Sequence, residues 1–184
     1  MNVFISGGCK NGKSFFAQRK AKEMAENCGK PLYYIATMIP YGEETRQKIE
    51  RHRMMRAKKM FETEECYMDL SGFSDRCMKS MEEPTYVLLE CMSNLTANEF
   101  YREDGAGDRT PEEILLGIDC LLAQTEHLIV VTNEVFSDGI LYDDSTEQYK
   151  KMLGEINAGL AVRSDAFVEV VCSIPVILKG GPLC

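Results

Sequence analysis

Apolar residues in this chain form short continuous runs, separated by longer stretches with helical periodicity. Several runs are apolar at nearly every position, which is typical of strands buried on both faces of a parallel sheet. The runs predict strands at Asn2–Ser6, Leu32–Ala36, Tyr86–Glu90, His127–Thr132, Phe167–Cys172 and Pro175–Leu178.

The stretches between these runs predict helices at Lys13–Asn27, Glu43–Met60, Phe73–Met81, Ser93–Tyr101, Pro111–Gln124 and Thr146–Ala161. Before the fifth helix, Thr110 is expected to act as the N-cap and Glu113 to complete a capping box. The polar, glycine-containing segment Arg102–Arg109 predicts a mobile loop. Alternating strands and helices predict an α/β fold, with a mainly parallel central sheet flanked by helices, in a single domain over residues 1–184.

The first strand leads directly into a glycine-rich segment. Residues 7–14 read GGCKNGKS, which fits the phosphate-binding P-loop pattern G-x-x-x-x-G-K-[ST] between a strand and a helix. Gly7 and Gly12 would bring backbone N–H groups close to phosphate oxygens, and the helix N-terminus would add its dipole. We expect Lys13 to reach the β- and γ-phosphates and the Ser14 hydroxyl to bind Mg²⁺. The segment therefore predicts a nucleoside triphosphate ligand.

A P-loop enzyme also needs an acidic group near Mg²⁺, at the carboxyl end of a neighbouring strand. Two glutamates qualify: Glu90 ends the run Tyr86–Glu90, and Glu134 follows the run that begins at His127. We favour Glu90 as the Walker-B-like acid, bound to the metal directly or through water. A solvated strand end remains the alternative for either residue.

Composition narrows the class of protein. The 184 residues carry a net charge of -8 and a pI of about 4.9, which argues against nucleic acid as a partner. There is no apolar run long enough to span a membrane, and the first residues do not resemble a signal peptide, so we expect a cytoplasmic protein. The eight cysteines are scattered without a C-x-x-C pair, which indicates free thiols in a reducing compartment.

One basic segment stands out in this acidic chain. Residues 46–59 hold seven of its 21 Lys and Arg residues, with His52 in their midst. On a helix, Lys48, His52 and Arg56 share one face, and their side chains could bind a triphosphate. Neighbouring positive charge disfavours imidazolium, so His52 would be a neutral nucleophile. A solvated basic helix with an incidental histidine stays open as the other interpretation, and His127, at the start of an apolar strand, is expected to be structural.

Taken together, these motifs resemble the bifunctional adenosylcobinamide kinase / adenosylcobinamide-phosphate guanylyltransferase family of cobalamin biosynthesis. The resemblance covers most of the chain. It lies in the P-loop, Tyr34–Thr37, Ile49–Arg56 with Glu64 downstream, Leu88–Cys91 with Asn98, Val131–Val135, and Gly154 with Asn157 and Ala161. The segment 133–142 departs from the family pattern and lacks one of its glycines and its proline. We expect this segment to shape a substrate or subunit contact.

The resemblance implies two reactions and a RecA-like P-loop fold. First, the γ-phosphate of ATP or GTP passes to a hydroxyl of adenosylcobinamide. Then His52 attacks the α-phosphorus of GTP, and GMP passes to the corrinoid phosphate. The resemblance also implies a homo-oligomer, with a trimer expected, and the P-loop and its acidic partner imply Mg²⁺ as cofactor. The nucleotide contacts it implies are Ser6, Gly7, Gly8, Cys9, Lys10, Asn11, Gly12, Lys13, Ala36, Thr37, Met38, Arg53, Met54, Met55, Arg56, Glu64 and Glu90.

Two other interpretations remain. A P-loop small-molecule kinase would use Lys13, Ser14 and Glu90 without a covalent role for His52. A regulatory nucleotide switch would need a guanine-reading N-K-x-D motif, which Asn133-Glu134-Val135 does not supply.

Overall fold

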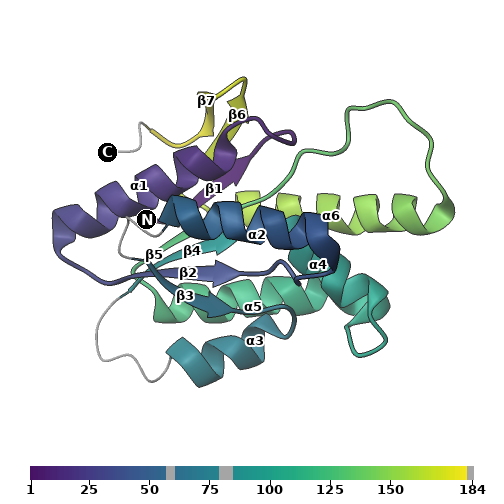
Figure 1. Cartoon of the computed structure of the whole chain (residues 1–184), viewed down its shortest axis with the longest axis horizontal. Coiled ribbons are helices and arrows are strands. Elements are labelled where there is room, and N and C mark those ends of the chain that lie inside the picture. The colour runs from purple at the N-terminus through teal and green to yellow at the C-terminus, as the bar shows by residue number, and fades with distance from the viewer. Residues whose placement is uncertain (57–60, 79–84, 182–184) are drawn as a thin grey trace.

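The computed structural model describes residues 1–56, 61–78 and 85–181. Its centre is a seven-stranded sheet with the order β3-β2-β4-β5-β1-β6-β7 (Figure 1). Every neighbouring pair is parallel except β6 and β7, which form an antiparallel hairpin. The strands are β1 Val3–Ser6, β2 Leu32–Ala36, β3 Phe61–Glu65, β4 Tyr86–Glu90, β5 His127–Val131, β6 Ala166–Val171 and β7 Ile174–Lys179.

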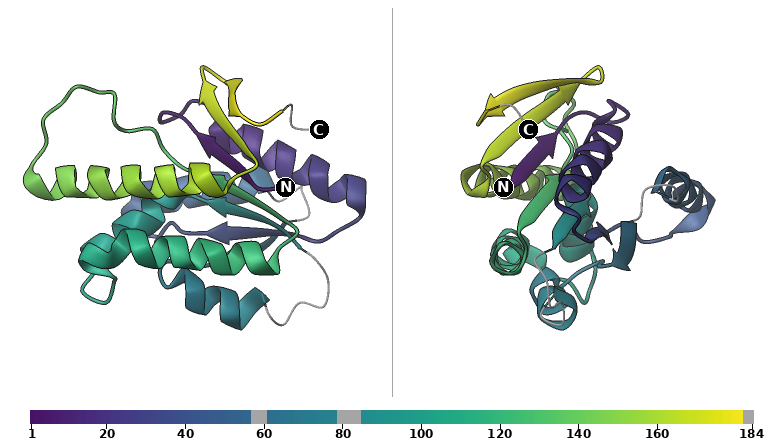
Figure 2. Two further views of the ribbon diagram at one scale, coloured as in Figure 1. Left: turned by 180° about the vertical axis from the view of Figure 1, so that it is seen from behind. Right: turned by 90° about the vertical axis from the view of Figure 1, so that its left-hand side faces the viewer.

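Helices cover both faces of this sheet (Figure 2). α1 packs on one face, and α3, α4, α5 and α6 lie on the other, while α2 stands apart on the α1 side. The helices are α1 Lys13–Cys28, α2 Gly42–Arg56, α3 Leu70–Phe73, α4 Met92–Tyr101, α5 Thr110–Gln124 and α6 Asp144–Arg163. A π-helical turn, Ser74–Met78, continues α3, and a 3₁₀ turn, Gly107–Arg109, precedes α5.

The alternation of side chains along the strands builds two cores. Phe4, Leu89 and Val130 face α4, α5 and α6, whereas Ile5, Leu88 and Val131 face α1. Because β1, β4 and β5 are buried on both faces, their runs are continuously apolar, as the parallel-sheet prediction required. The predicted α/β architecture is confirmed.

β3 was not predicted from the sequence. Its residues, Phe61–Glu65, contain a single apolar side chain, and it lies at the sheet edge with most of its positions exposed. Charged residues are common on edge strands because they discourage pairing with another chain, so an apolar pattern is missing there. The helix predicted over Glu43–Met60 corresponds to α2, and its last four predicted residues lie outside the described range.

Two local predictions are wrong. The capping box at Thr110 does not form: Thr110 is buried, its hydroxyl donates to the Gly107 carbonyl (2.7 Å), and Arg109 pairs with Glu113 (2.7 Å). The 3₁₀ turn places Arg109 at the N-cap, so the helix begins one residue earlier than expected.

The helix predicted over Phe73–Met81 begins instead at Leu70, where the Asp69 side chain accepts a hydrogen bond from the Gly72 N–H; residues 79–81 lie outside the described range.

His127 has the structural role expected of it. Its ring lies against the Tyr86 ring, with centroids 4.5 Å apart, and its Nδ1 lies 3.0 Å from the Met1 carbonyl oxygen. These contacts fasten the start of the chain to the amino end of β5.

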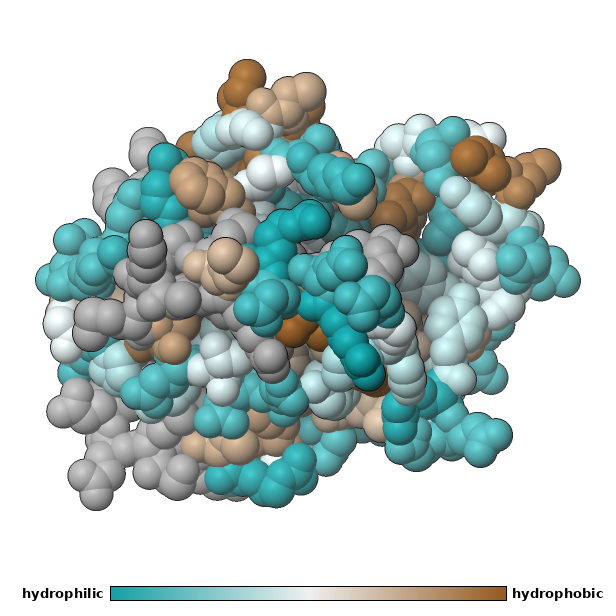
Figure 3. Space-filling model, in the orientation of Figure 1, coloured by the Kyte–Doolittle hydropathy of each residue, from teal (hydrophilic) through white to brown (hydrophobic). Residues whose placement is uncertain are grey.

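Apolar side chains are exposed at two places on the face shown in Figure 3. One lies over β7, where Ile174, Ile177 and Leu178 are exposed. The other lies over the segment 136–142, where the Leu141 side chain is 95% exposed. In the described part of the chain, no helix is both long enough and apolar enough to cross a membrane.

Candidate active site

The P-loop has the predicted strand–loop–helix form. β1 ends at the buried Ser6, residues 7–12 form the loop, and α1 begins at Lys13. Gly12 is the N-cap of α1 and has φ 86°, in the left-handed region that favours glycine. Since glycine has no side chain to cap the helix, the first-turn N–H groups of α1 are available to an anion.

Neighbouring strands hold the loop from both sides of β1. On the β5 side, the Glu134 N–H donates to the Gly7 carbonyl (3.0 Å). On the β6 side, the Ser173 N–H donates to the Asn11 carbonyl (3.0 Å), and the Val170 carbonyl oxygen lies 2.5 Å from where a Cβ on Gly7 would stand. The P-loop is therefore held against the carboxyl ends of the strands on either side of β1. No sequence motif predicted its contact with Ser173.

Lys13 and Ser14 occupy the first turn of α1. Lys13 is buried, and its ammonium donates to the Gly8 carbonyl (3.1 Å), which keeps the charge inside the loop. Ser14 is half-buried. Cys9 and Lys10 are exposed at the tip of the loop, and Gly8 and Asn11 are half-buried. The arrangement presents N–H donors and the Lys13 ammonium, which suits a phosphate.

Glu90 ends β4 at the same edge of the sheet. It is buried, with 6% of its surface exposed, and its Oε2 accepts hydrogen bonds from Tyr34 OH (3.0 Å) and Gln18 Nε2 (3.3 Å). Glu134, the other candidate acid, is half-buried and accepts from the Phe136 N–H (2.8 Å) and the Ser137 hydroxyl (2.9 Å). Thus Glu134 organises its own loop, whereas Glu90 lies beneath α1.

The oxygen atoms of Ser14 and Glu90 are the kind of donor that Mg²⁺ prefers. Within the described residues, no group of three or more His, Cys, Asp and Glu side chains could form a metal cage. Mg²⁺ in nucleotide sites is commonly held by one or two protein oxygens together with phosphates, so a hydroxyl and a carboxylate fit that pattern.

A buried polar network joins the ends of β2 and β4. Thr37 Oγ1 donates to the Cys91 carbonyl (2.7 Å) and accepts from the Cys91 N–H (2.8 Å). Asn98 Nδ2 donates to the carbonyls of Thr37 and Tyr67, both at 2.9 Å. Burial raises the pKa of the Cys91 thiol, so this group stays protonated. The network fixes Ala36, Thr37 and Met38 at the carboxyl edge of the sheet.

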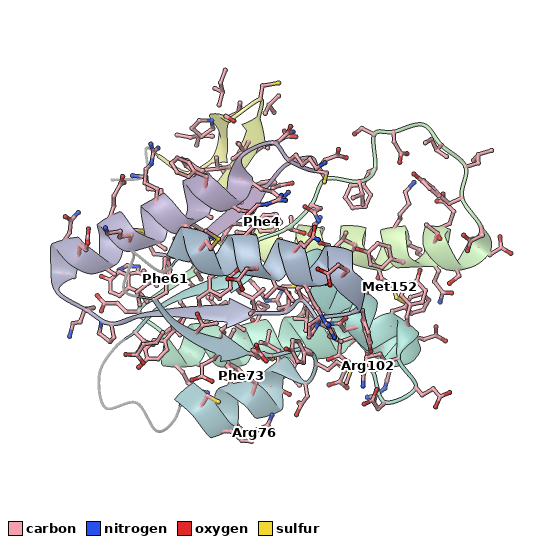
Figure 4. The ribbon with its side chains drawn as sticks, in the orientation of Figure 1. Phe4, Phe61, Phe73, Arg76, Arg102 and Met152 are labelled. Atoms are coloured by element: carbon pink, nitrogen blue, oxygen red, sulfur yellow. The ribbon has the colours of Figure 1, made fainter. Side chains whose placement is uncertain are left out.

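The segment after Met38 is fastened to the end of α4. Arg102, labelled in Figure 4, donates to both carboxylate oxygens of Asp104 (2.9 Å each) and to the Tyr41 hydroxyl (3.1 Å). The Arg102–Asp104 segment, predicted as a loop, therefore contacts Tyr41, the residue immediately before α2.

α2 carries the basic segment. His52 lies in its C-terminal half, and Met54 is 70% exposed. The side chains of Lys48, His52, Arg53, Met55 and Arg56 lie outside what the structure describes. The P-loop and Glu90 lie at one edge of the sheet, and the ribbon of α2 stands apart from the sheet (Figure 2).

Glu64 also lies away from the P-loop and Glu90. It pairs in register with Ile35, whereas Glu90 pairs with Ala36, so Glu64 and Glu90 face opposite sides of the sheet. Glu64 is exposed on β3 and contributes to raising the pKa of Tyr33, behind burial and the carboxylate of Glu62.

Two solved structures with P-loop ATPase folds are similar to this chain. One is an ATPase domain, with a TM-score of 0.56 and 12% identity, covering 98% of this chain and 78% of that one. The other is a KaiC-like protein from the hyperthermophilic archaeon Pyrococcus horikoshii, with a TM-score of 0.53 and 15% identity, covering 91% of this chain and 69% of that one. These similarities establish the RecA-like fold.

Sequence comparison is more specific. The chain is 26% identical over 183 residues to the bifunctional adenosylcobalamin biosynthesis protein CobP of Pseudomonas aeruginosa, with full coverage of both chains. Residues 3–178 match the family described as cobinamide kinase / cobinamide phosphate guanyltransferase. The match includes the P-loop, Glu90 and α2, and the chain therefore belongs to the cobinamide kinase / cobinamide phosphate guanyltransferase family.

Proposed function

We propose that this protein phosphorylates adenosylcobinamide and then transfers GMP from GTP to the product, giving adenosylcobinamide-GDP. The observation that carries the proposal is the pairing of a complete P-loop with the buried carboxylate of Glu90 at one edge of the sheet, in a chain of this family. The kinase and guanylyltransferase steps would each act on one phosphorus of a nucleoside triphosphate.

In the first reaction, the corrinoid hydroxyl oxygen bonds to the γ-phosphorus of ATP or GTP. The bond from that phosphorus to the β–γ bridging oxygen breaks, the nucleoside diphosphate leaves, and the hydroxyl proton is released to solvent. The loop N–H groups hold the phosphates, and Lys13 neutralises the charge that develops on the transferring group. Ser14 and Glu90 would hold Mg²⁺, which supplies further neutralisation of the phosphate oxygens when bound.

In the second reaction, a neutral His52 imidazole attacks the α-phosphorus of GTP and pyrophosphate leaves. A phosphate oxygen of the phosphorylated corrinoid then attacks the guanylyl group and releases the histidine. We assign Ala36, Thr37, Met38, Glu64 and the segment 53–56 as nucleotide contacts, on the strength of the resemblance. The cationic character of α2 supports this role, since its arginines would offset triphosphate charge.

A P-loop small-molecule kinase without guanylyl transfer is the competing proposal. Such a kinase needs the P-loop and Glu90 and assigns no covalent role to His52.

Two labelling experiments distinguish these proposals. With γ-labelled ATP or GTP, the wild-type protein should transfer label to adenosylcobinamide, and Lys13→Ala should abolish the transfer. With α-labelled GTP, the protein should acquire an acid-labile, alkali-stable label that is lost in His52→Ala. A wild-type protein that phosphorylates the corrinoid yet never acquires α-label is a kinase alone.

We further propose a homotrimer, as the resemblance implies, formed of single-domain chains. Composition and the expected absence of a signal peptide support a cytoplasmic location. Light scattering of the purified protein measures the oligomeric state directly.

A further inference from the structure

Three polar side chains meet inside the apolar core beneath α1. Gln18 of α1, Tyr34 of β2 and Glu90 of β4 are respectively 0%, 3% and 6% exposed. Tyr34 OH and Gln18 Nε2 both donate to the same oxygen, Oε2 of Glu90 (3.0 and 3.3 Å). Because burial of polar groups is costly unless they are hydrogen-bonded, the three side chains depend on one another.

Strand register and helix placement explain why they meet. Ala36 of β2 pairs with Glu90 of β4, so Tyr34, two residues earlier, lies on the same face of the sheet. That face is the one covered by α1, whose Phe16, Ala17 and Ala21 pack on the strands around Gln18. The Tyr34 ring is also held by Phe61 of β3, labelled in Figure 4, with a centroid distance of 6.0 Å.

Both of these donors are uncharged, an amide and a phenol, so they orient the carboxylate without forming an ion pair with it. Two donors to one oxygen also restrict the direction of the carboxylate plane. An oriented carboxylate at the end of a strand beside a P-loop is what a cation-binding group requires.

We propose that Tyr34 and Gln18 are positioning residues that orient the Glu90 carboxylate toward the Mg²⁺ of the bound nucleotide. This rests on the role given to Glu90 in the proposed function. It adds that the affinity for the metal–nucleotide complex is set by two side chains which touch neither metal nor nucleotide.

The direct test measures binding of a non-hydrolysable GTP analogue by calorimetry as Mg²⁺ is varied. In Tyr34→Phe, and separately in Gln18→Met, the Mg²⁺ concentration for half-maximal analogue binding should rise about tenfold to hundredfold, as is typical when a residue behind a metal ligand is removed. Binding without Mg²⁺ should stay within about twofold of wild type, because the P-loop itself is unchanged.

Tyr33→Phe is the matched control. Tyr33 is the adjacent residue of β2, pairs in register with Glu62 of β3, and lies on the opposite face of the sheet. The Tyr33→Phe variant loses a phenol hydroxyl from the same strand, but from the face away from Glu90. It should therefore leave the Mg²⁺ titration unchanged.

A double-mutant cycle separates positioning from general structural support. In a Glu90→Gln background, Tyr34→Phe should change Mg²⁺-dependent binding by less than about twofold, since the group that it orients is already gone. Equal effects of Tyr34→Phe in both backgrounds would overturn the proposal. So would wild-type Mg²⁺ titrations for Tyr34→Phe and Gln18→Met; if one of these variants fails to fold, the other decides.

The proposed function can fail separately. A wild-type protein that binds the analogue in a Mg²⁺-dependent manner but phosphorylates no corrinoid contradicts the proposed reaction, while the calorimetric comparison still decides the roles of Tyr34 and Gln18. In Glu90→Gln itself, the Mg²⁺ concentration for half-maximal analogue binding should rise at least as far as in Tyr34→Phe yet stay measurable, because Ser14 and the phosphates still bind the ion. An unchanged titration in Glu90→Gln contradicts the role given to Glu90.

Discussion

Gly7, the first residue of the P-loop, offers a sharp test of how the loop is built into the sheet. It has φ 153°, and a Cβ on it would stand 2.5 Å from the carbonyl oxygen of Val170 in β6. Real Cβ atoms essentially never come closer than 3.0 Å, so alanine must push a sheet carbonyl or the loop aside by about 0.5 Å. The backbone conformation costs about 1–3 kcal/mol for a residue with a side chain. Overpacking against a backbone atom adds about 1–3 kcal/mol.

Gly7→Ala should therefore lower the free energy of unfolding by about 2–6 kcal/mol. Two other glycines separate the contributions. Gly29 has φ 64° and nothing within 4 Å of its Cβ position, so Gly29→Ala should cost about 1–2 kcal/mol from backbone conformation alone. Gly181 has neither a positive φ nor a neighbour within 4 Å, so Gly181→Ala should stay within about 0.5 kcal/mol of wild type.

Urea unfolding of the three variants, followed by fluorescence and circular dichroism, gives these differences. Nucleotide binding by calorimetry should be lost in Gly7→Ala and kept in the other two. If Gly7→Ala destabilises the protein no more than Gly29→Ala does, then β6 does not hold the loop as described, and the reasoning fails.

Three further predictions concern the surroundings of the site. Asn98→Ala removes the donor to the Thr37 and Tyr67 carbonyls and should cost about 1–3 kcal/mol in urea unfolding, whereas Asn94→Ala on the same helix should cost less than half as much. Arg163 pairs with Asp119 through both carboxylate oxygens (2.6 and 2.9 Å) and holds the pKa of Asp119 below its usual value. A lowered carboxyl pKa stabilises the fold above the unfolded pKa, and this benefit is lost as the pH falls through the folded pKa. Asp119→Asn should therefore cost about 0.5–1 kcal/mol at pH 7, a figure kept small by solvent screening, and progressively less as the pH falls through the folded pKa of Asp119. At pH 8, iodoacetamide should label the exposed Cys9, Cys28 and Cys172, as mapped by peptide mass spectrometry, but spare Cys66, whose pKa burial raises to about 12. GTP with Mg²⁺ should protect Cys9 alone, and equal protection of Cys28 would contradict the placement of the nucleotide.

The parts of the fold that were predictable from sequence are those with a local pattern. The strand before Gly7 is a continuous apolar run, and the helix after Gly12 has helical periodicity. The P-loop pattern locates the junction between them. β3 could not be found in this way, because its only apolar residue is Phe61 and the others meet solvent at the sheet edge. The capping box predicted at Thr110 does not form, because the Thr110 hydroxyl donates to the Gly107 carbonyl in the preceding 3₁₀ turn. The sequence pattern had assigned this hydroxyl to the helix N-terminus.

The candidate site was predictable only in part. Glu90 could be proposed because it ends an apolar run, but Tyr34 and Gln18, which donate to it, come from β2 and α1, far away in sequence. Gln18 differs from an ordinary surface glutamine only in that α1 turns it toward the sheet, and Tyr34 depends on the register between Ala36 and Glu90. Such contacts follow from the crossing of elements, which a single sequence does not encode as a motif.

The most direct test of the proposed pair of reactions is a product analysis. Purified protein is incubated with adenosylcobinamide, GTP and Mg²⁺, and the corrinoids are resolved by chromatography and mass spectrometry. We expect wild type to yield adenosylcobinamide-GDP, His52→Ala to stop at adenosylcobinamide phosphate, and Lys13→Ala to leave the substrate unchanged. If His52→Ala still forms adenosylcobinamide-GDP at the wild-type rate, guanylyl transfer does not pass through His52, and the proposed covalent step is contradicted.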